Sequence, residues 1–259
     1  MVPCRGSSPT HRGSASRGVG GPWQSAVVDF LGTLHTMQDA FAATIPLVDL
    51  DAPVAGCPPW AAHDLVVHLA QVHHWAAAQA RGAVETPLDA DTDNLVDLYD
   101  ACATELRTTF AELDPGAPAT TLVGPGPVVF WHRRQVHETL VHLWDLRTAA
   151  GLDVEVEPEI WADGVDEIVT MFEPRQVRLG RIPPLARGVA LAAADAPGRW
   201  LLGSHQPQAP VTVADVTVTG PAKSLALMLW HRIAPAEAGV LVSGDRSALD
   251  DALAAHITP

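Results

Sequence analysis

Cysteine is scarce in this sequence, and the shortage argues against two kinds of protein. The three cysteines, Cys4, Cys57 and Cys102, are widely spaced and form no CxxC pair. Neither a disulfide framework nor a cysteine-rich zinc site is expected from such a pattern, and a reducing cytoplasm is the expected compartment.

Basic residues and long apolar runs are scarce as well. The chain has 16 Lys and Arg against 30 Asp and Glu, which gives a formal net charge of −14. Nucleic acids and anionic membranes bind basic patches, so neither is expected as a partner. No apolar run approaches the ~18 residues of a membrane-spanning helix, and the first residues lack the apolar segment of a secretory signal.

What the sequence does contain is helical periodicity. Residues 1–22, rich in Ser, Gly and Arg, predict a disordered tail. Beyond the tail, apolar residues recur at helical spacing in four segments, at 23–44, 60–79, 92–113 and 128–150. Four helices joined by loops predict a four-helix bundle over residues 23–152.

The pattern changes after Gly151. Strand-like segments at 186–195, 198–205, 210–220 and 238–245 are separated by Pro and Gly turns. Helical segments at 157–172, 222–233 and 246–256 lie between and around them. The predicted fold class is therefore α+β, with an N-terminal four-helix bundle and a smaller C-terminal α+β domain over residues 153–259.

A polar stripe runs along the fourth predicted helix, in "RQVHETLVHLWDL". Positions four apart on a helix lie about 40° apart around its axis, so Glu138 and His142 share one face. Arg134 lies one turn earlier and Asp145 about one turn later. Such a stripe either faces solvent or points inward at a metal, as in bundles that bind metals through carboxylates and histidines.

The second predicted helix is rich in histidine. Its His63, His68 and His73 are spaced by five residues, which rotates each about 140° from the last, so only one or two can reach one point. Asp64, one turn before His68, is placed to accept the second ring N–H of that histidine. Spacing alone leaves both a metal site and ordinary core or surface histidines open.

Two stretches together resemble a known family. "CPPWAAHDLVVHLAQVHHWA" and "FWHRRQVHETLVHLWDL" resemble the two signature helices of the mycothiol-dependent maleylpyruvate isomerase family, whose N-terminal bundle is DinB-like. "VTVTGPAKSLALMLWHR" and "VLVSGD" resemble the C-terminal domain of that family. The likeness covers nearly everything after the tail.

The resemblance implies a divalent metal, usually zinc, held by His68, Glu138 and His142. Three protein ligands leave an open position for water or a thiol. The implied cofactor is mycothiol or a related low-molecular-weight thiol, activated as a thiolate. In the isomerase reaction, this thiolate adds to the cis double bond of maleylpyruvate, and rotation and elimination follow. Related members resemble thiol S-transferases.

The resemblance also suggests roles for residues around the metal. Arg134, on the polar stripe, is expected to contact the cofactor or an acidic substrate, with an ion pair to Glu138 as the alternative. Arg232 aligns with an arginine expected to act in catalysis at the cleft between the domains, with a surface salt bridge as its alternative. Cys57 is expected to be structural. A pocket or structural role is expected for His73, and surface or boundary positions for His63, His74, His132 and His137.

Three functions remain open on this basis. The first is a mycothiol-type isomerase or thiol S-transferase, and the second is another metal-dependent hydrolase or tailoring enzyme on the same bundle. The third is a non-enzymatic protein that binds a metal or a small molecule. Three protein ligands with an open coordination position favour an enzyme. Its partner is expected to be a small electrophile or acidic substrate, and the protein a cytoplasmic monomer or small homo-oligomer.

Overall fold

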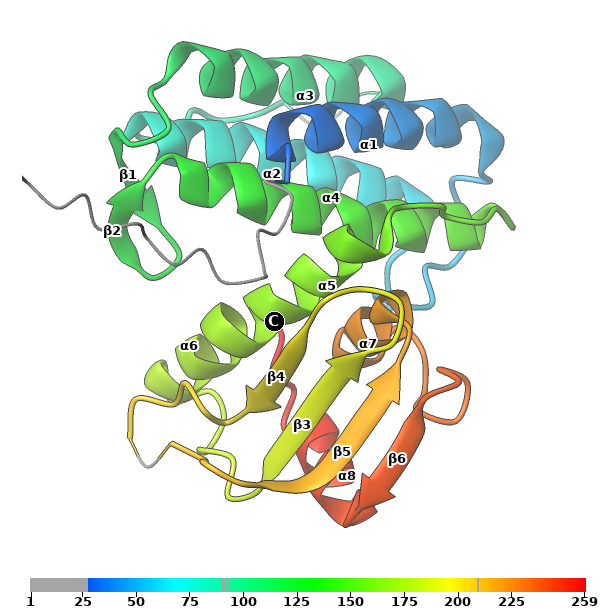
Figure 1. Cartoon of the computed structure of the whole chain (residues 1–259). Helices are drawn as coiled ribbons and strands as arrows, with labels where there is room; N and C mark the ends of the chain where they lie inside the picture. Colours follow the sequence, from blue (N-terminus) through cyan, green and yellow to red (C-terminus); the bar gives the residue numbers. More distant parts are fainter. Residues whose placement is uncertain (1–27, 90–91, 93, 209) are drawn as a thin grey trace, which may run out of the picture.

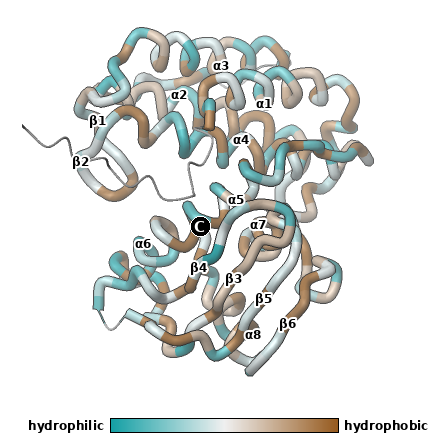
Figure 2. The backbone as a smooth tube through the Cα atoms, viewed as in Figure 1, coloured by the Kyte–Doolittle hydropathy of each residue, from teal (hydrophilic) through white to brown (hydrophobic). Residues whose placement is uncertain are grey.

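The computed structural model describes residues 28–89, 92, 94–208 and 210–259. A helical layer lies over a layer of sheet and helices, with one long helical segment between them (Figure 1). The predicted tail, residues 1–22, falls outside the described residues. Hydrophobic residues occur throughout both layers (Figure 2), and their buried members form one continuous core.

The helical layer is the predicted four-helix bundle, which is confirmed. Its helices are α1 (Phe30–Thr44), α2 (Ala62–Arg81), α3 (Leu95–Glu112) and α4 (Val129–Ala149). Each has a stripe of buried residues that faces its neighbours. On α4 this buried set is unusually polar, and it contains Arg134, His142 and Asp145.

The connections in the bundle contain structure that the sequence did not predict. A 3₁₀ turn, η1 (Ile45–Leu47), follows α1, and a hairpin of β1 (Pro118–Thr121) and β2 (Gly124–Pro127) precedes α4. The hairpin lies in a segment expected to be a loop, where Pro and Gly are frequent. The Trp131 indole N–H donates to the Thr120 carbonyl at 2.8 Å, which ties the hairpin to the first turn of α4.

One continuous helical path links the two layers. It consists of α5 (Pro158–Glu167), the π-helical turn η2 (Ile168–Phe172) and α6 (Glu173–Arg178). The sequence predicted a helix only as far as residue 172. Pro174 lies at the start of α6 and has no N–H to continue an α-helical ladder. The wider π turn carries the helix past this proline.

The second layer contains a four-stranded mixed sheet in the order β4-β3-β5-β6. Its strands are β3 (Gly188–Ala193), β4 (Arg199–Leu202), β5 (Ala214–Gly220) and β6 (Leu241–Gly244). β3 pairs in parallel with β5, and the other pairings are antiparallel. Two helices, α7 (Ala222–Leu229) and α8 (Arg246–Ala254), pack against it. The predicted α+β class is confirmed, and the domain limits at 152 and 153 stay a prediction.

The two layers meet where α5 packs on α7 and close to α4. The Lys223 ammonium donates to the Val154 carbonyl at 2.9 Å, and the Arg133 guanidinium pairs with Asp163 at 2.8 Å. Arg232, just after α7, pairs with Asp145 of α4 at 2.8 Å, so the end of α7 lies beside the polar face of α4. In the part of the chain that the structure describes, no helix combines the length and apolarity needed to cross a bilayer.

Candidate metal centre

Three side chains from two helices converge at the inner face of the bundle. The Nε2 atom of His68, on α2, lies 3.6 Å from Oε1 of Glu138 on α4. The Nε2 atom of His142 lies 3.3 Å from the same oxygen. The three donor atoms all lie within 4.8 Å of one another. The structure thus brings the three expected ligands together, and their binding of a metal stays a prediction.

Aromatic rings set the position of His68. Its imidazole packs against Trp60, with ring centroids 4.6 Å apart, and meets the His142 ring edge-on at 5.1 Å. Trp60 lies just before α2, and a bond from its amide to the Cys57 carbonyl fixes this turn at 2.8 Å. The His68 side chain remains 32% exposed, so a small molecule can approach the ring.

His142 is held from its other side by Asp145. Nδ1 of His142 lies 3.0 Å from Oδ2 of Asp145, one turn along α4, which directs Nε2 toward Glu138. The Asp145 side chain is fully buried, and Arg232 binds both of its oxygens. Nε of Arg232 donates to Oδ1 at 3.0 Å and a terminal nitrogen donates to Oδ2 at 2.8 Å. A residue of the C-terminal domain thereby orients an expected ligand of the bundle through one carboxylate.

Glu138 is held in a similar way by Arg134. The Arg134 guanidinium, only 3% exposed, donates to Glu138 and, with another nitrogen, to Glu167 on α5. The Phe172 ring covers this guanidinium, whose central carbon lies 4.9 Å from the ring centroid. The expected contact of Arg134 with a cofactor stays a prediction. The structure places its charge between two carboxylates.

The electrostatics of the cluster favour a charged pair. Burial tends to raise the pKa of Glu138, but Arg134, His142 and His68 hold it well below its usual range. Burial tends to lower the pKa of His142, but Asp145, Cys57 and Glu138 raise it well above its usual range. Glu138 is therefore ionised and His142 protonated near neutral pH. A cation that takes Nε2 of His142 as a ligand must displace that proton.

A cavity of ≈ 950 Å³ opens onto this cluster. On the bundle side, Trp60 and the three expected ligands line it. On the side of the C-terminal domain, the lining includes Trp230, His231, Arg232 and His256. The site therefore lies at a boundary between the two layers, with side chains from both.

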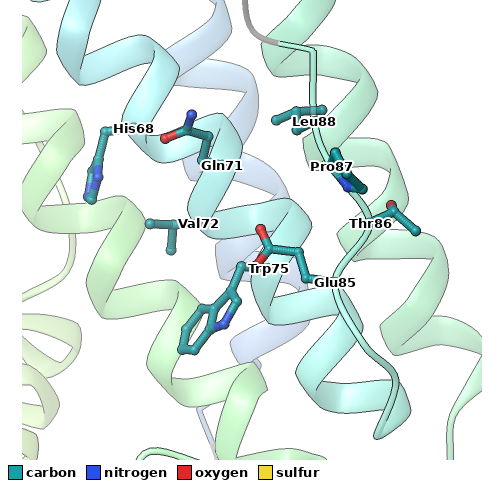
Figure 3. Close-up of a pocket in the computed structure, with 8 residues that line it drawn as sticks. All are labelled: His68, Gln71, Val72, Trp75, Glu85, Thr86, Pro87 and Leu88. Atoms are coloured by element: carbon teal, nitrogen blue, oxygen red, sulfur yellow. The ribbon is translucent and has the colours of Figure 1, made fainter.

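A second, smaller cavity of ≈ 420 Å³ is also lined by His68 (Figure 3). It is formed between α2 and the segment that follows this helix, and Gln71, Trp75, Glu85 and Thr86 are among its lining residues. His68 lines both cavities. One expected ligand is thus reachable from two spaces.

Three expectations about neighbouring residues were wrong. Asp64 was expected to support His68, but its Oδ2 accepts the Ala61 N–H at 2.9 Å. α2 starts at Ala62, so Asp64 lies in the first turn, where amide groups have no helical partner. His132 and His137, expected at the surface or a boundary, are 4% and 2% exposed, since Phe110 of α3 packs on the His132 ring and Asp163 of α5 pairs with His137.

The remaining histidines of α2 lie away from the cluster. His73 is fully buried, with Nδ1 bonded to Gln135 at 2.8 Å, and burial lowers its pKa to about 4. This agrees with a structural role. His74 pairs with Glu105 at 2.6 Å, and His63 is exposed.

The sequence placed Asp145 on the polar stripe but did not assign it as the partner of His142 and Arg232, and it gave Cys57 a structural role. The Cys57 Sγ atom accepts from Arg232 at 3.1 Å and lies 3.6 Å from Oδ2 of Asp145, on the wall of the larger cavity. The position of Asp145 three residues after His142 was a usable signal. Nothing local could have paired it with Arg232, which lies 87 residues later in the chain.

Comparison with known proteins gives a consistent result. Residues 31–147 match the mycothiol maleylpyruvate isomerase N-terminal domain, and residues 159–251 match the C-terminal domain of the same family. Uncharacterized proteins of two Mycobacterium tuberculosis strains are 32% identical over 132 residues, which covers 48% of this chain and 68% of theirs.

Two solved structures share the fold. They are crystal structures of a mycothiol-dependent maleylpyruvate isomerase and of a point mutant of it, with TM-scores of 0.61 and 0.62. Both are 16% identical to this chain, and the match covers 83% of this chain and 92% of theirs. At this identity the likeness establishes the fold alone.

Proposed function

This chain belongs to the mycothiol maleylpyruvate isomerase family, and on that basis we propose that it is a metal-dependent enzyme that uses a mycothiol-type thiol. It acts as an isomerase of maleylpyruvate-like substrates or as a thiol S-transferase. The observation that carries the proposal is the convergence of His68, Glu138 and His142 at the wall of a large cavity.

The donor set fits a divalent ion, zinc in particular. Two imidazole nitrogens and one carboxylate oxygen are typical of catalytic zinc sites that keep an open position. Asp145 already holds Nδ1 of His142 and leaves Nε2 as the donor, which is the usual arrangement of a metal-bound histidine. When bound, such an ion lowers the pKa of a thiol, so that the thiolate is available near neutral pH.

The residues around the donors orient them, and one of them keeps the carboxylate ligand ionised. Arg134 keeps Glu138 ionised, and Arg232 keeps Asp145 in place beside His142. We assign Arg232 a positioning role, because each of its three nitrogens is already engaged, by Asp145, Cys57 or the Trp230 carbonyl. Trp60 and Trp230 add apolar surface that limits water in the cavity.

Two cavities that meet at His68 suit a reaction with two reactants. A thiol and an electrophile must reach the same point, and each space offers one approach. In the isomerase reaction the sulfur adds to one carbon of the cis double bond. The remaining single bond rotates, and elimination returns the thiol. No oxidant and no protein thiol is consumed.

Elemental analysis of the purified protein tests the ligand set. Wild type should contain a stoichiometric divalent metal, and His68→Ala and Glu138→Ala should lose it while their circular dichroism stays unchanged. His35→Ala is a matched control, because His35 is exposed on α1, where it pairs with Asp39. Full metal content in either site variant would contradict the proposed ligands.

A turnover assay separates the candidate functions. Maleylpyruvate should be converted only when mycothiol and metal are both present. Turnover that needs metal but no thiol would point to another metal-dependent enzyme instead. A metal-loaded protein with no turnover on maleylpyruvate or on other thiol-reactive electrophiles would point to a binding protein.

A further inference from the structure

Two histidines of the C-terminal domain line the same large cavity as the candidate metal centre. His231 follows the last turn of α7, and His256 follows the last turn of α8. Their ring centroids lie 5.0 Å apart, with the planes tilted by 41°. Both line the same cavity as the three expected ligands.

The backbone at both positions is strained. His231 has φ 58° and His256 has φ 51°, and among the described residues they alone have positive φ without being glycine. Glycine is the usual residue at this point after a helix, because it has no Cβ to clash. The chain itself uses glycine there at the ends of α2, α4 and α6, where Gly82, Gly151 and Gly180 have φ of 63°, 70° and 68°.

Five helices, α2, α4, α6, α7 and α8, thus end in a residue with positive φ. Histidine takes the place of glycine only after α7 and α8, the two ends that reach the cavity. Strain retained at a binding surface, when the same chain avoids it elsewhere, indicates a use for the side chain. The use is not packing in the core, because both residues are exposed. It is not an internal hydrogen bond either, because neither imidazole has a hydrogen-bond partner among the described residues.

The surroundings of the pair favour an anion over a cation. Burial lowers the pKa of His231, and the nearby groups that lower it further are His256 and Arg232, both basic. No acidic side chain is among the described groups that shift the pKa of His231, and a carboxylate can accept a hydrogen bond from an N–H of each ring.

We propose that His231 and His256 form a carboxylate-binding pair that holds a negatively charged electrophile with its reactive carbon facing the metal centre. The identity of this ligand as a substrate rests on the proposed function, but the binding of a small carboxylate does not. The pair selects charged electrophiles over their neutral analogues. The other two cationic candidates, Arg134 and Arg232, are already bound to carboxylates.

Direct binding tests the pair without any need for turnover. The probes are maleate, a small dicarboxylate, and its uncharged dimethyl ester. Calorimetry on full-length His68→Ala, which removes the expected metal ligand, should show maleate binding and no ester binding. Adding His231→Asn and His256→Asn should lower the affinity for maleate at least about tenfold, since one hydrogen bond to a charged group is enough for a change of this size. Asparagine suits these positions because it tolerates positive φ.

Nuclear magnetic resonance of histidine-labelled protein locates the binding. Maleate should shift the ring signals of His231 and His256, identified by their loss in the single variants, and should leave the signal of His35 unchanged. Unchanged maleate affinity in the double asparagine variant, or equal binding of the ester, would overturn the proposal. The His35→Ala control should bind maleate as its parent does.

Stability measurements test the argument from strain. His231→Gly and His256→Gly should melt at or above the temperature of the wild type, although they lose maleate affinity. A lower melting temperature would show that the rings stabilise the fold, and would overturn the inference that strain is kept for binding.

Turnover with an unchanged KM in the double asparagine variant would reject the pair and leave the proposed function standing. If the wild type binds maleate through the histidine pair but shows no turnover, the pair is supported and the proposed function is rejected.

Discussion

Glu138 on α4 is surrounded by Arg134 and two histidines, whereas Glu173 at the start of α6 is fully buried with neither carboxylate oxygen bonded in the described part of the chain. The pKa of Glu138 is held well below its usual value. Burial raises the pKa of Glu173 from 4.5 to about 7. Burial without a partner therefore raises the pKa of Glu173 toward neutral pH, whereas Arg134 and two histidines keep Glu138 ionised.

This difference explains why the C-terminal domain matters to a site on the bundle. α4 supplies two expected ligands, but α5 and the end of α7 supply Glu167 and Arg232, which complete the charge pairs around them. Each pair lies at the boundary between the layers. The bundle alone would leave Asp145 without its cation.

The strongest test makes the environment of Glu138 resemble that of Glu173. Arg134→Met removes the cation between Glu138 and Glu167 and leaves two buried carboxylates. We expect a loss of about 3–5 kcal/mol in the free energy of unfolding at pH 7, with weaker metal binding because Glu138 is less ionised. Urea denaturation and elemental analysis measure the two effects.

Arg133→Met is the matched control for that variant. Arg133 pairs with Asp163 and Asp166 at a more exposed position, so its removal should cost about 1 kcal/mol and leave the metal content unchanged. If both variants lost the same free energy of unfolding, the ion pairs of Arg134 would stabilise the fold no more than those of Arg133. A change in KM for the thiol with normal metal content in Arg134→Met would instead support a direct contact between Arg134 and the cofactor.

The second test removes the charge of Glu173. The unfolded chain loses this proton near pH 4.5 and the folded chain near about 7, so the wild type loses stability as pH rises through that window. Glu173→Gln should avoid the loss. We expect it to be more stable than wild type by on the order of 3 kcal/mol at pH 8, and nearly equal at pH 4. Denaturation curves at several pH values would show this, and a constant difference across pH would contradict it.

The smallest expected effect comes from Gly56, which lies against the Arg232–Asp145 pair. A Cβ atom there would lie 2.5 Å from Oδ1 of Asp145 and 2.8 Å from Nε of Arg232. Gly56→Ala must shift that pair, with a loss of about 1–2 kcal/mol and reduced metal affinity through His142. Gly116→Ala, at an exposed turn, is the control and should change neither. A normal metal affinity in Gly56→Ala would weaken the role given to Asp145.

Much of the fold was predictable because its signals are local. Helical periodicity located all four bundle helices, and Pro and Gly turns separated the strands of the sheet. The shared face of Glu138 and His142 followed from their spacing, and His68 followed from the resemblance of two helices to a known family. The hairpin before α4 was missed because its strands consist of Pro, Gly, Ala and Thr, which are read as loop.

The supporting contacts of the site were not predictable, because they depend on contacts between distant parts of the chain and on where a helix begins. Asp64 had a better partner in the first turn of its own helix, a choice that depends on where α2 begins. The pairing of Asp145 with Arg232 depends on how the second layer docks, which no local pattern encodes. The strained backbone at His231 and His256 likewise becomes visible only in three dimensions.

The bond between Asp145 and Arg232 also sets an order of events during synthesis. The ribosome releases the bundle first, and Arg232 emerges only after 86 further residues have been added behind Asp145, since the two are 87 positions apart. A nascent chain that has folded its four helices still lacks the arginine that holds Asp145 beside His142. The support of His142 through Asp145 is therefore complete only after α7 has docked.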